Sequence, residues 1–207
     1  DTDTDTDTDV DTGVEQPIVD CLPDHGVFSS ASRWVYDWQN ANRTGDRQIS
    51  VSEYSPDKNE FALLTIDNWT NGSSSYTANI VESYRCDENG LYLLSRTFDS
   101  RLRISGFSDD VTSRVTTYTT APLLRPNTPV LGETWTRRAV GTVTINGVEE
   151  AIDTTELFVV SEADVLYRTE FDRGFRHLGS AGTEELWIPE VGIAIHPTLT
   201  FLRSHTP

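Results

Sequence analysis

The chain has 207 residues but no methionine, only two cysteines and no long apolar run. No stretch approaches the roughly 18 apolar residues that a membrane-spanning helix needs. The two cysteines are too few for a disulfide-rich scaffold, and they do not form a C-x-x-C motif. A chain of this length buries roughly 70% of its unfolded surface, so a core is expected without disulfides or metals. Because methionine is missing, the sequence lacks its initiator, and an export signal, if the protein has one, is expected to have been removed.

Basic residues are scarce as well. Lys and Arg number 16 against 33 Asp and Glu, which gives a formal net charge of -17. Such a surface repels phosphate backbones, so nucleic acid is not expected as a partner. For the same reason direct contact with an anionic membrane is not expected. The Asp/Thr tract at 1–9 resembles the tracts that follow the acylated cysteine of Gram-negative lipoproteins, which implies attachment to a membrane only through an N-terminal lipid anchor outside this chain.

The first twenty residues differ in composition from the rest. Residues 1–9 alternate Asp and Thr, and a tract of uniform charge cannot bury apolar surface against its own repulsion. We therefore expect a disordered stalk over 1–20, followed by one domain over 21–207. Asp7, Asp9 and Asp11 match the first three ligand positions of a calcium loop, but the bidentate glutamate at its end is missing. No metal or other cofactor is indicated.

The two cysteines, Cys21 and Cys86, are both flanked by polar residues. In an oxidising compartment they would pair and close a loop of about 65 residues. The alternative is two unrelated buried thiols.

The domain consists of alternating apolar and polar runs separated by Gly, Asn, Asp and Ser, a pattern typical of strands. Asn146 and Gly147 predict a two-residue hairpin between strands at 142–145 and 148–160, because both residues tolerate positive φ angles. No segment shows twelve residues of helical period. The other predicted strands are Arg33–Trp38, Gln48–Tyr54, Glu60–Asp67, Tyr76–Arg85 and Leu91–Phe98.

Two stretches, 29–98 and 128–196, look like a faint internal repeat, with the proline-rich segment Thr119–Pro129 as their junction. Together they would supply more strands than a flat sheet tolerates, since strand twist accumulates. We therefore predict an all-β fold, a single large antiparallel sheet curled into a half-barrel or open barrel.

Two short motifs carry a family resemblance. Pro129–Trp135 contains Pro followed by Gly-x-x-Trp, and Trp187–Ile193 contains Trp-x-Pro-x-Val-Gly. They resemble a group of uncharacterised bacterial exported lipoprotein β domains, from which this chain departs at Glu190, where Gly is usual, and at Arg137, where an aromatic is usual. The resemblance implies an exported protein of the cell envelope or the extracellular space. It also implies a sheet distantly similar to that of periplasmic lipoprotein carriers, which wrap around acyl chains.

Motifs for catalysis are weak. The histidines His25, His177, His196 and His205 are scattered, and we interpret each as a surface or hydrogen-bonded side chain. The adjacent carboxylates Glu149-Glu150 and Glu184-Glu185 would point to opposite faces of a strand, so neither pair can act as an acid–base dyad. We therefore expect a non-catalytic protein with a binding or structural role. The alternative is a secreted module that binds carbohydrate or protein, and an unrecognised hydrolase is the third possibility.

Two sets of residues are candidates for binding. The first would line a concave sheet and hold a lipid or other apolar ligand, or else would meet across a dry core. The second is Trp69, predicted in a polar loop, where it would contact a protein or a glycan as in a secreted binding module. The candidate lining residues are Trp34, Ile49, Val51, Trp135, Val143, Ile145, Ile152 and Phe158.

Overall fold

The structure, a computed structural model, describes residues 32–38, 44–127, 129–168, 171, 173–189, 191–196 and 200–206. The predicted stalk, the calcium-like aspartates and Cys21 lie outside these residues. Cys86 lies within them and is buried. Its pairing with Cys21 stays a prediction.

The described part of the chain forms thirteen strands and one short 3-10 turn. All five single strands predicted from the sequence are present, and most extend further than predicted. The strands are β1 Arg33–Trp38, β2 Thr44–Ser55, β3 Glu60–Asn71, β4 Ser74–Asp87, β5 Gly90–Ile104, β6 Asp110–Thr120, β7 Leu123–Pro126, β8 Thr134–Ile145, β9 Val148–Val165, β10 Gly174–Gly179, β11 Glu184–Ile188, β12 Gly192–His196 and β13 Thr200–Thr206.

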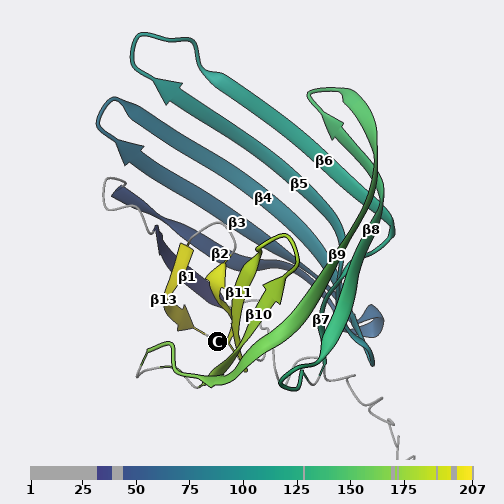
Figure 1. The fold of residues 1–207 in the computed structure, drawn as a ribbon. Helices are drawn as coiled ribbons and strands as arrows, with labels where there is room; N and C mark the ends of the chain where they lie inside the picture. The colour runs from purple at the N-terminus through teal and green to yellow at the C-terminus, as the bar shows by residue number, and fades with distance from the viewer. Residues whose placement is uncertain are drawn as a thin grey trace, which may run out of the picture.

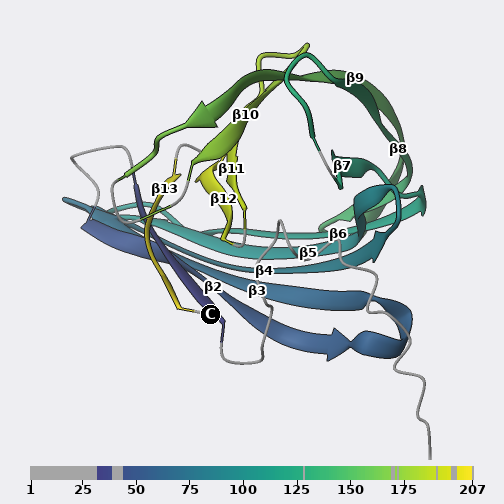
Figure 2. The same ribbon diagram turned by 90° about the horizontal axis from the view of Figure 1, so that it is seen from below.

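The strands form one antiparallel sheet that closes on itself (Figures 1 and 2). Apart from β7, each strand pairs with the next along the chain, and β13 pairs with β1 to complete a ring of twelve strands. The predicted all-β antiparallel sheet is confirmed, but the ring is closed rather than half-open. Closure satisfies the backbone N–H and C=O groups that the edges of an open sheet would leave unpaired.

The strand β7 does not occupy a position of its own in the ring. It pairs with the first residues of β5, while β6 pairs with the rest of that strand, so β7 continues the line of β6 beyond Pro122. Proline lacks the N–H that a ladder needs, which explains the interruption. The segment Thr119–Pro129, predicted to join two repeats, is therefore part of the same sheet.

The barrel has one tall wall and one short wall. Strands β2 to β6, with β8 and β9, are 11 to 18 residues long, whereas β1 and β10 to β13 have only 5 to 7. The long strands rise well beyond the short ones as a curved wall (Figure 1). From β1 to β5 the strands become longer, whereas from β9 to β12 they become shorter. Strand lengths therefore do not support the internal repeat of 29–98 and 128–196, which stays a prediction.

The predicted hairpin between β8 and β9 is present. Asn146 and Gly147 form the turn with φ angles of 49° and 87°, and the two strands pair from Ile145 and Val148 down to Thr134 and Val159. An irregularity in β9 occurs near Glu162, where its register with β10 shifts. A bulge of this kind bends the strand and lets it turn into the short wall.

Strand β11 is buried on both faces. Leu186 and Ile188 pack with Trp34, Tyr36 and Leu202 in one cluster, whereas Trp187 belongs to another, with aromatic and leucine side chains of the tall wall. Figure 2 shows β11 and β12 folded inward within the outline of the barrel. The short wall therefore packs against the tall wall and partly fills the lumen.

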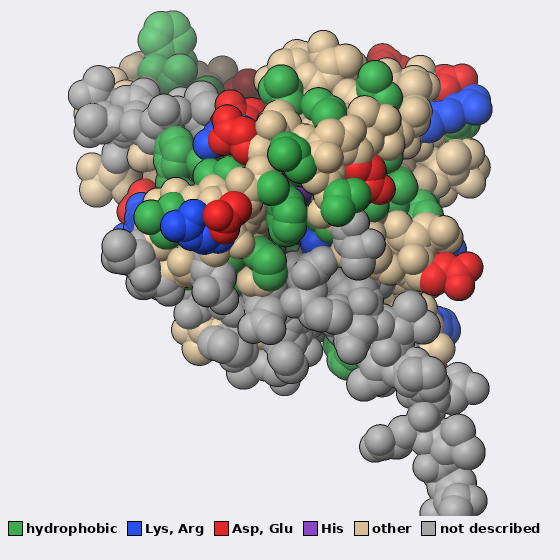
Figure 3. Space-filling model, turned by 60° about the horizontal axis from the view of Figure 1, so that its bottom comes forward, with side chains coloured by type: hydrophobic (Ala, Val, Ile, Leu, Met, Phe, Trp, Pro, Cys, Tyr) green, Lys and Arg blue, Asp and Glu red, His purple; other side chains and the backbone are tan. Residues whose placement is uncertain are grey.

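The outer surface carries dispersed apolar side chains rather than one continuous patch. Figure 3 shows hydrophobic side chains near the middle of the lower face, separated by polar, acidic and basic groups. Exposed apolar side chains lie within strands, among them β3, β4, β6 and β9, as well as at turns. The four most exposed lie at turns or at the start of a strand. They are Phe107, Val130, Leu131 and Val148.

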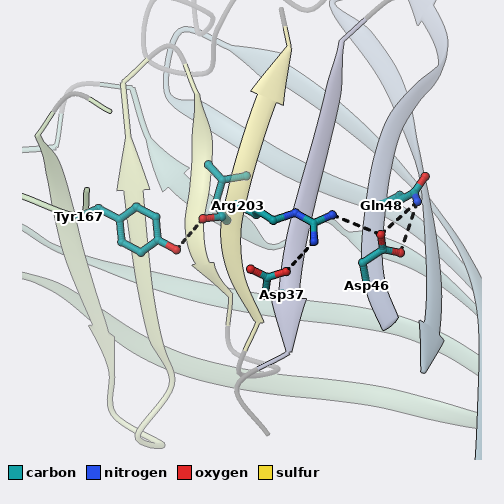
Figure 4. A network of polar contacts seen from close by, with 6 residues as sticks. Asp37, Asp46, Gln48, Tyr167 and Arg203 are labelled. Atoms are coloured by element: carbon teal, nitrogen blue, oxygen red, sulfur yellow. Dashed lines mark hydrogen bonds and ion pairs between the residues drawn. The ribbon is translucent and has the colours of Figure 1, made fainter. Parts of the chain in front are cut away.

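Polar contacts join the strands at the closing seam between β13, β1 and β2 (Figure 4). Arg203 donates from Nη1 to Asp37 Oδ1 at 3.0 Å and from Nη2 to Asp46 Oδ2 at 3.5 Å. The hydroxyl of Tyr167 donates to the carbonyl oxygen of Leu202 at 2.8 Å. The first and last strands of the barrel are thus joined by side chains as well as by the backbone ladder.

Candidate ligand-binding cavity

A cavity of about 500 Å³ lies in the lumen between the tall wall and the inward-folded β11 and β12. Side chains from β4 to β9 and from β11 and β12 line it. Small-molecule sites typically measure roughly 300 to 1,000 Å³, so the cavity is large enough for a ligand.

A narrow apolar extension of about 80 Å³ adjoins this cavity. The two share Glu82, Tyr84, Arg96, Leu124, Trp187 and Ile193 as lining residues. Beyond the shared part the extension is lined mainly by aromatic and aliphatic side chains, among them Trp34, Tyr36, Ile49, Phe61 and Leu63. The lumen therefore combines a polar chamber with an apolar end.

Hydrogen bonds hold the aromatic side chains of the apolar end in place. Trp34 donates from Nε1 to the carbonyl of Val191 at 2.6 Å, and the Tyr36 hydroxyl donates to the carbonyl of Ile193 at 2.7 Å. Burial raises the pKa of Tyr36 well above its usual value, so the phenol stays neutral and keeps its proton for this bond. These bonds also fix β12 against β1.

One ion pair in the polar chamber joins β8 to β11. Arg137 Nη1 lies 3.0 Å from Glu185 Oε1, and Arg137 Nη2 donates to the carbonyl of Leu124 at 2.7 Å. Glu185 also accepts a hydrogen bond of 2.9 Å from Trp187 Nε1. The guanidinium carbon lies 3.8 Å from the ring centre of Phe158, a cation–π distance. The carbonyl of Leu124, the indole of Trp187 and the ring of Phe158 therefore all help to hold this ion pair in place.

A second ion pair joins β4 to β5. Arg96 Nε lies 3.5 Å from Glu82 Oε1, and the Tyr84 hydroxyl donates to Glu82 Oε2 at 2.8 Å. Burial raises the pKa of Tyr84 well above its usual value, and the negative charge of Glu82 raises it further. The tyrosine therefore remains a hydrogen-bond donor at any physiological pH.

A third pair closes the apolar end. Arg47 donates from Nε and Nη2 to the two carboxylate oxygens of Asp67, both at 2.7 Å, and both side chains are buried. The two residues stand directly opposite each other in the β2–β3 register. Bidentate geometry of this kind is the strong form of the Arg–carboxylate interaction.

His177 on β10 is fully buried and makes no hydrogen bond with either ring nitrogen within the described part of the chain. Its ring lies 5.0 Å from that of Trp135 and 6.2 Å from that of Trp187. Burial, together with the positive charges of Arg125 and Arg137, lowers the pKa of His177 to about 3. The sequence interpretation of a surface or hydrogen-bonded histidine was wrong here, because aromatic rings rather than polar groups surround it.

The eight candidate lining residues divide into two groups. Trp34 and Ile49 line the apolar extension. The others line neither cavity: Trp135 and Phe158 stack at 5.4 Å in a closed cluster, and Val51 is buried in the core. Val143 is buried as well, whereas Ile145 and Ile152 are half-buried further up the tall wall. The sequence left two interpretations open, residues that line a concave sheet and residues that meet across a dry core. The first fits Trp34 and Ile49, and the second fits Trp135, Phe158 and Val51.

Trp69 does not lie in a loop, contrary to the sequence interpretation. It belongs to β3, which continues to Asn71, and its half-buried ring stacks on Tyr76 of β4 at 5.4 Å. Polar residues on both sides obscured the strand, because the outer face of a tall wall can be polar throughout.

The charged residues of the polar chamber were missed in the sequence. Glu82 and Arg96 lie on the inner face of strands that were predicted. The signal that could have placed Glu82 there is its position between Ile80 and Tyr84, because residues two apart share a face of a strand. For Glu184 and Glu185 the prediction of opposite faces is confirmed: Glu184 is exposed and pairs with Arg176, while Glu185 is buried and faces the chamber.

Comparison with known proteins returns no match among family models, curated proteins or solved structures. Within the described ranges, no helix is long and apolar enough to cross a membrane.

Proposed function

We propose that this protein is a non-catalytic binding protein that holds a small amphipathic or apolar ligand in the lumen of its barrel. The observation that carries the proposal is the polar chamber of about 500 Å³ that continues into an aromatic-lined apolar end. Such a lumen suits a ligand with an apolar body and a polar group, because each part meets matching side chains.

The proposal includes export. An exported carrier of the cell envelope, tethered by an N-terminal lipid anchor outside this chain, would keep its ligand out of water between two membranes or at a surface. The support is the Asp/Thr tract at 1–9 and the two motifs around Trp135 and Trp187, which resemble exported lipoprotein domains.

A second candidate is a surface-binding module. The stacked pair of Trp69 and Tyr76 on the tall wall offers two neighbouring half-buried rings, an arrangement on which a sugar ring of a glycan could stack. An unrecognised hydrolase has no specific observation in its favour.

Filling the chamber tests the main proposal. Ala139 lines the cavity, whereas Ala151 is exposed on the opposite face of the same hairpin. We expect the neutral fluorescent probe 1-N-phenylnaphthylamine to bind wild type and Ala151→Phe, and to bind Ala139→Phe at least about ten-fold more weakly. Circular dichroism and gel filtration check that both variants fold. Equal binding by the two variants would place the probe outside the lumen and sink the proposal.

A further inference from the structure

The charges of the polar chamber do not balance. Its wall holds three carboxylates, on Glu82, Glu156 and Glu185, but only two guanidiniums, on Arg96 and Arg137. Each guanidinium already has a carboxylate partner, since Arg96 pairs with Glu82 and Arg137 with Glu185. The charge left over is negative.

Glu156 is the carboxylate that the described residues leave without a cation. Its one hydrogen bond comes from the backbone N–H of Ala181 at 3.3 Å. Arg137 stands opposite Glu156 in the β8–β9 register, but its terminal nitrogens donate to Glu185 and to the carbonyl of Leu124. One guanidinium does not neutralise two carboxylates, so Glu156 keeps its charge available for a ligand.

The fold leaves room for this carboxylate at one position. A Cβ atom on Gly179 would lie 2.1 Å from Glu156 Oε1, so the carboxylate lies directly over this glycine and a larger residue would displace it. The hairpin turn that follows then presents the Ala181 N–H to the same oxygen. Glu156 therefore lies over the β10–β11 turn at the border of the chamber.

Aromatic rings complete the environment. Tyr84, Tyr118 and Trp187 line the same chamber as Glu156. The faces of such rings attract cations, and a carboxylate beside them adds a full negative charge. A further arginine, Arg125, lies behind the ring of Trp187 and does not line the chamber.

From this imbalance we infer that the ligand carries a cationic group, an amine or ammonium, which binds at Glu156 while its apolar body occupies the aromatic end of the lumen. The inference deepens the proposed function and rests on it. A fatty acid or other anionic amphiphile would instead place its charge beside an unneutralised carboxylate. To bind it, Arg96 or Arg137 would have to be shared with the carboxylate that it now faces, Glu82 or Glu185.

A matched series of amphiphiles tests the inference. Dodecylamine, dodecanol and dodecanoate share one chain length and differ in head-group charge. Each is titrated below its micelle concentration into the full chain, with calorimetry or Trp fluorescence as the readout. We expect dodecylamine to bind about ten-fold more tightly than dodecanol, and dodecanoate to bind most weakly.

Variants at one position assign the preference. Glu156→Gln keeps the size of the side chain and should reduce dodecylamine affinity about five- to ten-fold while leaving dodecanol binding unchanged. Glu156→Lys should reverse the order of dodecylamine and dodecanoate. The control is Glu149→Gln, which removes an exposed carboxylate from the same strand and should change nothing.

The possible results distinguish failure of the proposed function from failure of the cationic head group. If no member of the series binds, the proposed function fails and this inference with it. If all three bind but dodecanoate equals or exceeds dodecylamine, the lumen is a binding site and the cationic head group is wrong. A preference for dodecylamine that survives Glu156→Gln would likewise overturn the role of this carboxylate.

Discussion

Arg203 on the last strand lies 3.0 Å from Asp37 on the first, although 166 positions separate them in the chain. The contact marks the seam at which the barrel closes. In the rest of the ring, apart from β7, the paired strands follow one another along the chain, whereas β1 and β13 come from the two ends of the described chain.

Burial rather than this ion pair should hold the seam. The Arg203–Asp37 pair is half-exposed, so Asp37→Asn should lower the free energy of unfolding by only about 0.5 kcal/mol. Leu202, on the inner face of the same strand, is fully buried in the core, and Leu202→Ala should cost about 2 to 5 kcal/mol. Urea denaturation of both variants checks the ranking. A larger loss for Asp37→Asn would mean that the outer polar contacts close the barrel.

The Arg47–Asp67 pair should be sensitive to the loss of one partner and tolerant of the loss of both. Both side chains are buried, so Asp67→Asn leaves a charge without a counter-ion, and we expect a loss of about 3 to 5 kcal/mol. The double variant Arg47→Met with Asp67→Leu should recover most of this loss, because apolar side chains of similar volume avoid the desolvation cost. Denaturant titrations of Arg47→Met, Asp67→Leu and the double variant measure the coupling. Additive losses would contradict the prediction.

His177 should make the fold sensitive to mild acid. Burial lowers its pKa to about 3 in the folded protein, while the unfolded chain has the ordinary value of about 6.5. Below pH 6.5 the unfolded state takes up a proton that the folded state refuses, so stability falls as the pH falls toward 3, by up to about 1.4 kcal/mol per pH unit.

The matching variant is His177→Phe, which keeps an aromatic ring between Trp135 and Trp187 and removes the titrating nitrogens. Its stability should change less than that of wild type between pH 6.5 and 5, a window above the range where most carboxylates titrate. Chemical denaturation at several pH values gives the comparison. Parallel pH profiles for the two proteins would show that another group is responsible.

Cys21 and Cys86 should form a disulfide when the protein is made in an oxidising compartment. Cys86 is buried in β4, and a bridge to Cys21 would tie the start of the domain to the tall wall. In the chain-entropy model a loop of this size contributes up to about 4 kcal/mol. Intact-mass measurement under non-reducing conditions, with thiol alkylation, decides the point: two alkylated thiols in the folded protein would disprove the bridge.

Much of the fold follows from local patterns. Alternation places strands at Arg33–Trp38 and Glu60–Asp67, and Asn146-Gly147 sets the β8–β9 hairpin, because these signals act between residues close in sequence. The opposite orientation of Glu184 and Glu185 follows from the same period of two. The strands β6 and β13 were not predicted, since Thr, Ser and Arg dominate them and their apolar positions are few.

The sequence by itself determined an antiparallel β domain with an acidic surface, and which side chains share a face of each strand. Tertiary structure decided that the sheet closes through β1 and β13, that β11 folds inward, and that Glu82, Glu156 and Glu185 meet two arginines in one chamber. Alternation of apolar and polar residues is a local pattern, and it determines which face of a strand each side chain occupies. Closure of the barrel and the shape of its cavity depend instead on pairings between strands far apart in the chain, which no local pattern encodes.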